Sequence, residues 1–203
     1  MRIGILGGTF DPVHYGHLIL AEQCREQGRL DQVWFLLAAR PPHKGEDLIS
    51  RFEQRAEMLA LAIAGNPAFR VESIEKDRPG PSYTADTLQT LHQLHPADEF
   101  FLLVGSDTLK DLPTWHEPHV VLRHAGLLVM LRPNNPLIPL EQLRARLPEG
   151  TPLRLEIVET PLIDISSRDL RRRAAAGRSL RYFLPRAVEC YIHEKGLYRV
   201  SDG

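Results

Sequence analysis

The chain has 203 residues, of which 43% are hydrophobic and 25% are charged, a composition typical of a soluble protein with one sizeable core. Its formal net charge of −1 excludes a general attraction to nucleic acid or to an anionic membrane, so any recognition of phosphate must come from a local site. We expect a single domain over residues 1–203, located in the cytoplasm, because the sequence shows neither a secretory signal nor an apolar run of the roughly 20 residues that span a membrane.

Six apolar segments of strand length alternate with helical patterns along the chain. The expected strands cover residues 2–6, 33–38, 69–74, 100–104, 126–131 and 153–158. Apolar residues at three- and four-residue steps predict helices within 17–30, 51–65 and 84–94. This alternation predicts an α/β fold, with a Rossmann-like, doubly wound parallel sheet and helices on both of its faces.

Two proline-bearing segments are predicted to be loops. "RPPHKGED" follows the second strand and "RPGPSYT" follows the third, at the edge of the sheet where α/β proteins bind ligands. The stretch "RPNNPLIPLEQLRARLPEGTP" is expected to be a less regular surface excursion rather than a second domain.

The segment after the first strand favours an anion. Gly7 and Gly8 are followed by a turn at "DP" and by a helix expected to begin near His17, so backbone N–H groups and a positive helix end are directed to one place. The phosphate loops G-x-x-x-x-G-K-[ST] and G-x-G-x-x-G are absent, and "LLAARPPHK" stands where a dinucleotide enzyme has the acidic residue that holds a ribose. A nicotinamide-dependent dehydrogenase is therefore not expected.

His14 and His17 are three residues apart, so in the first turn of a helix they project to the same side, with Gly16 leaving room for a ligand. Two imidazoles can donate hydrogen bonds to phosphate oxygens or supply two ligands of a metal site. The metal alternative needs a third ligand, for which only His43 offers itself. The two cysteines, Cys24 and Cys190, have no metal-binding spacing and are interpreted as buried thiols. We predict no protein-held metal. A structural pair of helix-start histidines is the remaining alternative.

Two motifs carry a resemblance to a known superfamily. "GGTFDPVHYGH" resembles the signature of the nucleotidyltransferases that have [HT]-x-G-H after a glycine-rich first strand, and "ISSRDLRRRAAAG" is similar to their ISSTxxR segment. Arg168 replaces the usual threonine of that segment, so a hydroxyl contact to phosphate is not inferred there. Independently, Ser166 or Ser167 can cap a helix whose first turn, with Arg171, faces the phosphates.

Three further stretches, 40–44, 81–88 and 105–116, make the chain resemble nicotinate mononucleotide adenylyltransferases, and the likeness extends through "YIHEKGLY" at 191–198. The resemblance implies transfer of AMP from ATP to nicotinate mononucleotide, giving nicotinate adenine dinucleotide (deamido-NAD) and pyrophosphate in NAD biosynthesis. The implied partners are ATP and nicotinate mononucleotide. Mg²⁺ would arrive with ATP, held mostly by phosphates and water. The sequence does not give the oligomeric state.

The resemblance also implies three groups of site residues. The catalytic group is His14, His17, Lys44 and Arg171. The ATP-binding group is Gly7, Gly8, Thr9, Phe10, Gly105, Asp107, Ile165, Ser166 and Ser167. The group that binds nicotinate mononucleotide is Tyr83, Thr84, Trp115, His43 and Arg132.

The residue types suit these roles. Trp115 is expected to follow a loop after the fourth strand, where its indole could stack on a pyridine ring. The helix start at Tyr83 and Thr84 could receive a carboxylate. The structural alternatives are a core tryptophan, plain N-capping at Thr84 and an unrelated helix cap at Asp107.

Other functions stay open on the sequence alone. A pantetheine-phosphate or glycerol-phosphate nucleotidyltransferase would share the two end motifs, but neither accounts for Trp115 together with "PSYT". A catalytically silent nucleotide-binding regulator and a metal-dependent phosphohydrolase are the alternatives from other classes. The arginines beyond Arg171 are interpreted as a solvated helix face, so nucleic-acid binding is not expected.

Overall fold

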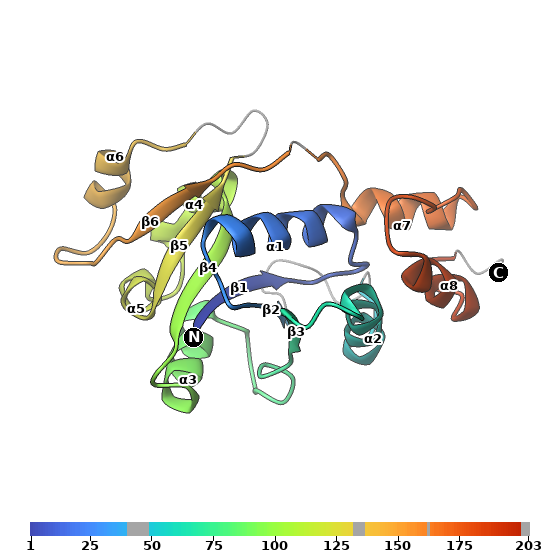
Figure 1. Ribbon diagram of the computed structural model, residues 1–203, viewed down its shortest axis with the longest axis horizontal. Coiled ribbons are helices and arrows are strands. Elements are labelled where there is room, and N and C mark those ends of the chain that lie inside the picture. The colour runs from blue at the N-terminus through green and yellow to red at the C-terminus, as the bar shows by residue number, and fades with distance from the viewer. Residues whose placement is uncertain (40–48, 132–136, 162, 200–203) are drawn as a thin grey trace.

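The computed structural model describes residues 1–39, 49–131, 137–161 and 163–199 (Figure 1). Within them, one parallel sheet is built from β1 (Arg2–Gly8), β2 (Gln32–Leu37), β3 (Phe69–Glu72), β4 (Glu99–Gly105), β5 (Ala125–Met130) and β6 (Leu155–Val158). The strand order is β3-β2-β1-β4-β5-β6, so the chain reverses its direction of progress across the sheet between β1 and β4. This is the doubly wound, Rossmann-like order, and the predicted fold class is confirmed.

Helices cover both faces of the sheet (Figure 1). Their bounds are α1 (Tyr15–Gln27), α2 (Phe52–Ile63), α3 (Thr84–Leu94), α4 (Ser106–Asp111), the 3₁₀ helix η2 (Leu112–Thr114), α5 (Pro118–His124), α6 (Leu140–Ala145), α7 (Ser167–Ala175) and α8 (Arg186–Glu194). Buried side chains of α1, α2, α7 and α8 join one core cluster, whereas those of α3, α4, α5 and α6 join a second.

The central strands contribute side chains to both core clusters. In β4, Phe101 and Leu103 belong to the first cluster, while Phe100, Leu102 and Val104 belong to the second. Successive side chains of a strand point to opposite faces, so a strand covered by helices on both sides needs an almost continuous apolar run. This requirement explains why the strands could be recognised in the sequence.

The structure differs from the sequence prediction in several helices. Helix α1 begins at Tyr15 rather than near His17. The segment between β4 and Trp115, predicted to be a loop, forms α4 and η2, and Pro113 occupies an early position in η2 where its missing N–H does no harm. Helix α6 lies inside the predicted surface excursion. Helices α5 and α8 had not been predicted.

The two cysteines lie in different environments. Cys24 is buried, as expected, and burial raises the pKa of its thiol to about 12. Cys190 is only half-buried, so the expectation of two buried thiols is wrong for this residue.

No helix in the described part of the chain is long and apolar enough to cross a membrane. The single domain over 1–203 and the cytoplasmic location stay predictions.

Replacing Leu88 with alanine tests the packing of α3 on the sheet. Leu88 is 0% exposed, so the variant should lose about 2–5 kcal/mol of unfolding free energy through lost burial and the cavity left behind. Leu94→Ala on the same helix is the matched control, because Leu94 is 62% exposed and its removal should change stability by no more than about 0.5 kcal/mol. Urea unfolding measures both, and equal losses would contradict this packing.

Candidate active site

Strand β1 ends in two glycines, just before the loop that leads to α1, and each glycine has a different structural role. A Cβ on Gly7 would meet open space, and Gly7 is exposed at the edge of a cavity. A Cβ on Gly8 would come within 2.8 Å of the ring of Phe10. Phe10 has a φ of +48° and its ring is 2% exposed, so the loop folds its own phenylalanine beneath Gly8. Only glycine leaves room for this arrangement.

The side chain of Arg55, in α2, hydrogen-bonds to the backbone of the same loop. It is 2% exposed, and its guanidinium donates to the carbonyl oxygens of Thr9 at 3.0 Å, Ala38 at 2.9 Å and Ser50 at 3.0 Å. Burial lowers the pKa of Arg55, although the Asp11 carboxylate opposes this effect. One buried side chain therefore ties together the ends of β1 and β2 and the start of α2.

The two histidines lie against each other at the start of α1. His14 is the N-cap residue and is 5% exposed, and its ring stacks on the ring of His17 with centroids 3.7 Å apart. The backbone N–H of His14 donates to Nδ1 of His17 at 3.3 Å, so the proton of a neutral His17 lies on Nε2. A Cβ on Gly16 would come within 3.0 Å of the His14 ring. A side chain at position 16 would therefore require the His14 ring to shift by a few tenths of an ångström.

Helix α7 is fastened to this loop by its first two turns. Ser166 caps the helix, accepting the N–H of Asp169 at 3.2 Å, as predicted. The Ser167 hydroxyl donates to the carbonyl of Pro12 at 2.9 Å, and Nη1 of Arg171 donates to the carbonyl of Asp11 at 2.6 Å. A second helix start is thus fixed beside the histidines. Arg168 is exposed at the same rim.

Two cavities meet at His17, which lines both. The larger one, of about 1280 Å³, is also lined by His14, Gly16, Ser50, Asp107, Ile165, Ser166, Ser167, Arg171 and Tyr198, among others. The smaller one, of about 350 Å³, is lined by Gly7, Gly8, Glu75, Thr84, Gly105 and Trp115, among others. Because one imidazole borders both spaces, a group bound in one cavity can come close to a group bound in the other.

A buried polar cluster supports the wall of the smaller cavity. Thr87 is 0% exposed and donates its hydroxyl to Glu75 Oε1 at 2.8 Å, while Arg78 Nη1 donates to the same hydroxyl oxygen at 2.7 Å. Glu75 is itself 3% exposed. These bonds fix the segment that leads into α3, so that the helix starts at Thr84 on the cavity wall.

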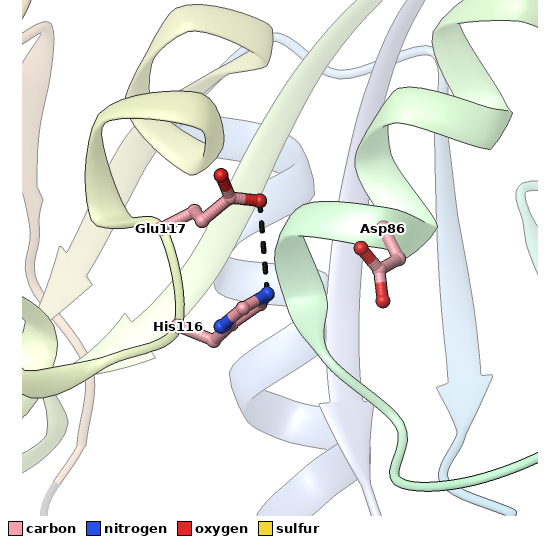
Figure 2. Close-up of side chains that lie close together, drawn as sticks. All are labelled: Asp86, His116 and Glu117. Atoms are coloured by element: carbon pink, nitrogen blue, oxygen red, sulfur yellow. Dashed lines mark ion pairs between the residues drawn. The ribbon is translucent and has the colours of Figure 1, made fainter.

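A second group of polar side chains lies at the start of α3 and directly after Trp115. Figure 2 shows Asp86, from the first turn of α3, beside His116 and Glu117, which follow Trp115. A ring nitrogen of His116 and a carboxylate oxygen from each of Asp86 and Glu117 lie within 4.8 Å of one another. His116 Nε2 is 3.6 Å from a carboxylate oxygen of Glu117. The His116 ring also lies 4.3 Å from the ring of Tyr83. These contacts join the start of α3 to the segment that carries Trp115.

The structure brings together most of the predicted site residues that it describes. His14, His17, Arg171, Asp107, Ile165, Ser166 and Ser167 line the larger cavity, and Gly7, Gly8, Gly105, Thr84 and Trp115 line the smaller one. Thr9 and Phe10 line neither cavity. The Thr9 carbonyl accepts a hydrogen bond from Arg55, and the Phe10 ring lies in the core. Tyr83 caps α3. His43, Lys44 and Arg132 fall outside the described residues.

Sequence reasoning missed three residues that hold the site together. Asp11 is 1% exposed, and it accepts a hydrogen bond from the hydroxyl of Tyr198. The third is Arg55. It stands three residues after Phe52 and four before Leu59, so an arginine on the apolar face of a predicted helix was the available signal. Asp11 and Tyr198 are 187 residues apart, and no local pattern connects them.

Comparison with known proteins gives consistent matches along the chain. The sequence profile of the cytidylyltransferase-like family matches residues 5–173. A probable nicotinate-nucleotide adenylyltransferase of Thermus thermophilus is 46% identical over 98% of this chain and 100% of its own length. One from a Roseiflexus species is 49% identical over 97% of this chain and 98% of its own.

Solved structures agree on the fold. The Plasmodium falciparum nicotinic acid mononucleotide adenylyltransferase in complex with NaAD superposes with a TM-score of 0.79 at 20% identity, covering 97% of each chain. The same enzyme in complex with APC gives 0.78 at 20% identity, over 97% of this chain and 96% of that one. At this identity the likeness concerns the fold alone. Together with the two fixed helix starts and the full-length relatives, these matches place the chain in the cytidylyltransferase-like family, among the nicotinate-nucleotide adenylyltransferases.

Proposed function

We propose that the protein transfers AMP from ATP to nicotinate mononucleotide, forming nicotinate adenine dinucleotide and pyrophosphate, in NAD biosynthesis. The observation that carries this proposal is the position of His17 between two cavities of different character, in a chain whose full-length relatives bear the name of this activity. The reaction joins two phosphate esters, and it needs a site where each is bound separately and their phosphates meet.

The larger cavity has the properties of a triphosphate site. It is lined by the first turns of α1 and α7, whose positive ends attract anions, and by the guanidinium of Arg171. The N–H groups of "ISS" are proposed to bind the phosphates in this cavity, and Asp107, which also lines it, a ribose hydroxyl. Gly7, Gly8 and Gly105 line the smaller cavity, so the N–H groups of "GGTF" are proposed to bind phosphate, and Gly105 to border the adenosine part, where the two cavities adjoin.

The smaller cavity suits a nicotinate ring. Trp115 is half-buried and lines this cavity, so its indole can offer a face for stacking. The N–H groups at the start of α3, at Thr84, can receive the nicotinate carboxylate. Tyr83, His43 and Arg132 are proposed to complete this half of the site.

The chemistry requires alignment more than activation. The 5′-phosphate of nicotinate mononucleotide is already a competent nucleophile, and it attacks the α-phosphorus of ATP in line, so that pyrophosphate leaves with the breaking P–O bond. The residues offset the repulsion between two polyanions and hold them in register. Nε2–H of His17 is proposed to donate to an oxygen of the transferred phosphate, and His14, Lys44 and Arg171 to hold the neighbouring oxygens.

Nucleotidyltransferases use ATP with a divalent metal ion, and we propose Mg²⁺ here. The lining of the larger cavity fits a metal that arrives with its nucleotide. Among the described residues, it contains the arginines Arg168, Arg171 and Arg172, which suit phosphates, and only two carboxylates, those of Asp107 and Asp164. Mg²⁺ bound to the phosphates neutralises part of their charge. Asp107 and Asp164 are the residues that could reach its water ligands.

The substrate pair can be tested directly. Purified protein with ATP and Mg²⁺ should form dinucleotide and pyrophosphate with a much higher kcat/KM for nicotinate than for nicotinamide mononucleotide, because helix N–H donors match a carboxylate. Dinucleotide and pyrophosphate are quantified by chromatography. No dinucleotide from either substrate, or a preference for phosphopantetheine, would contradict the proposal, and tight ATP binding without turnover of any acceptor would indicate a silent regulator.

The role of His17 makes a separate prediction. His17→Ala should lower kcat by about 100-fold or more, because it removes a donor placed between the two substrates, while the melting temperature stays close to wild type. His92→Ala is the control, because His92 is exposed on α3 and lines neither of these cavities. Steady-state kinetics of both variants decide the matter, and near-normal turnover of His17→Ala would remove this residue from the mechanism.

A further inference from the structure

We propose that Tyr198 is a positioning residue for the ATP half of the site. Its hydroxyl holds the buried carboxylate of Asp11, and thereby holds the loop that carries His14 in the geometry that binds the triphosphate. This inference rests on the proposed function for its substrate. It adds the end of the described chain to the machinery of that function.

The contacts of Asp11 show why one phenol matters. Asp11 is 1% exposed, so its carboxylate depends on protein donors. Tyr198 Oη donates to Oδ1 at 2.5 Å, and the backbone N–H of Ser50 donates to Oδ2 at 3.1 Å. The guanidinium of Arg171 lies 3.9 Å from Oδ2 and donates to the Asp11 carbonyl. Removal of the phenol leaves one buried carboxylate oxygen without its shortest hydrogen bond.

The partners of Asp11 are walls of one cavity. Ser50, Arg171 and Tyr198 all line the larger cavity, together with His14, which lies three residues after Asp11. They come from the segment before α2, from α7 and from the chain after α8, which are distant in sequence. Asp11 is therefore the point where three walls of the proposed ATP pocket are tied to the loop of the first histidine. The smaller cavity, with Trp115, shares His17 and Leu20 of α1 with the larger one, but it is lined by none of Ser50, Arg171 and Tyr198.

The backbone on each side of this bond is in an unfavourable conformation. Tyr198 has a φ of +65° and Phe10, next to Asp11, has a φ of +48°, a region that bulky residues rarely occupy. Such conformations persist only where the surrounding contacts impose them. The hydrogen bond between Tyr198 and Asp11 is one such contact, and it connects the two segments.

The phenol keeps its proton under ordinary conditions. Burial raises the pKa of Tyr198, and the neighbouring Asp11 carboxylate raises it further. Tyr198 therefore acts as a hydrogen-bond donor and not as an acid or base. Its removal should change substrate affinity without adding or removing an ionisation in the pH profile.

The test uses two tyrosines that both donate to a carboxylate. Tyr198→Phe removes only the hydroxyl that Asp11 accepts. Tyr191→Phe is the matched control, because Tyr191 donates to Glu57 Oε2 at 2.9 Å from α8 and does not line either cavity. We measure KM for ATP and for nicotinate mononucleotide, kcat, the melting temperature, and the Kd of MgATP by calorimetry.

Tyr198→Phe should raise the Kd and KM for ATP about tenfold, with the KM for nicotinate mononucleotide changed less than about twofold. Tyr191→Phe should leave both substrates at wild-type values. An unchanged Kd for MgATP in Tyr198→Phe, or equal losses for both substrates or in both tyrosine variants, would overturn the inference.

Asp11→Ala removes the acceptor of the same bond, together with the oxygen that Ser50 contacts. It should weaken ATP binding at least as much as Tyr198→Phe, and adding Tyr198→Phe to it should cause little further loss, because the phenol then has no carboxylate to hold. Additive losses would overturn the inference. If wild-type protein forms no dinucleotide, the proposed function fails, whereas the MgATP calorimetry still decides the role of Tyr198.

Discussion

Irregular backbone that is buried must have its carbonyl oxygens paired, and in this protein that requirement falls on the loop between β1 and α1. Each carbonyl from Thr9 to Pro12 for which a partner has been described is bonded to a side chain from a distant part of the chain. Arg55 reaches Thr9, Arg171 reaches Asp11 and Ser167 reaches Pro12. The conformation of the loop therefore depends on the packing of α2 and α7 against it.

This dependence explains how the site acquires two helix starts. Satisfying the loop brings the N-terminus of α7 beside that of α1, so that two positive helix ends and the guanidinium of Arg171 border one cavity. The same loop places His17 on the boundary with the smaller cavity, where Thr84 and Trp115 lie. The polar bonds that stabilise the fold are thus the ones that bring together the groups that we propose bind two anionic substrates.

Sequence reasoning succeeded where local pattern determines structure. Strands β1, β2, β4 and β5 were recognisable because both of their faces are apolar, and the cap at Ser166 was recognisable because capping depends on residues three apart. The site motifs were found from the resemblance, and the structure adds their physical reasons, such as the space for the His14 ring above Gly16. Local pattern failed at α4 and η2, where the cue was a short polar segment with a single proline.

The residues that could not be predicted act through long-range contacts. Asp11 belongs to a motif whose histidines attract attention, and nothing near it in the sequence indicates Tyr198 as its partner. Glu75 and Thr87 are likewise separated by a loop and meet only after α3 packs on the sheet. Such pairs are determined by tertiary structure, so a single sequence offers no spacing rule for them.

The central claim is that two substrates in adjoining cavities react directly beside His17, and that the adenylyl group is never bound covalently to the protein. The most direct test is the stereochemical course of the reaction with ATP that carries a chiral α-phosphorothioate. Direct in-line attack inverts the configuration at phosphorus, so the dinucleotide should show inversion. Retention would require two successive displacements, and with them a covalent intermediate, and would contradict the mechanism.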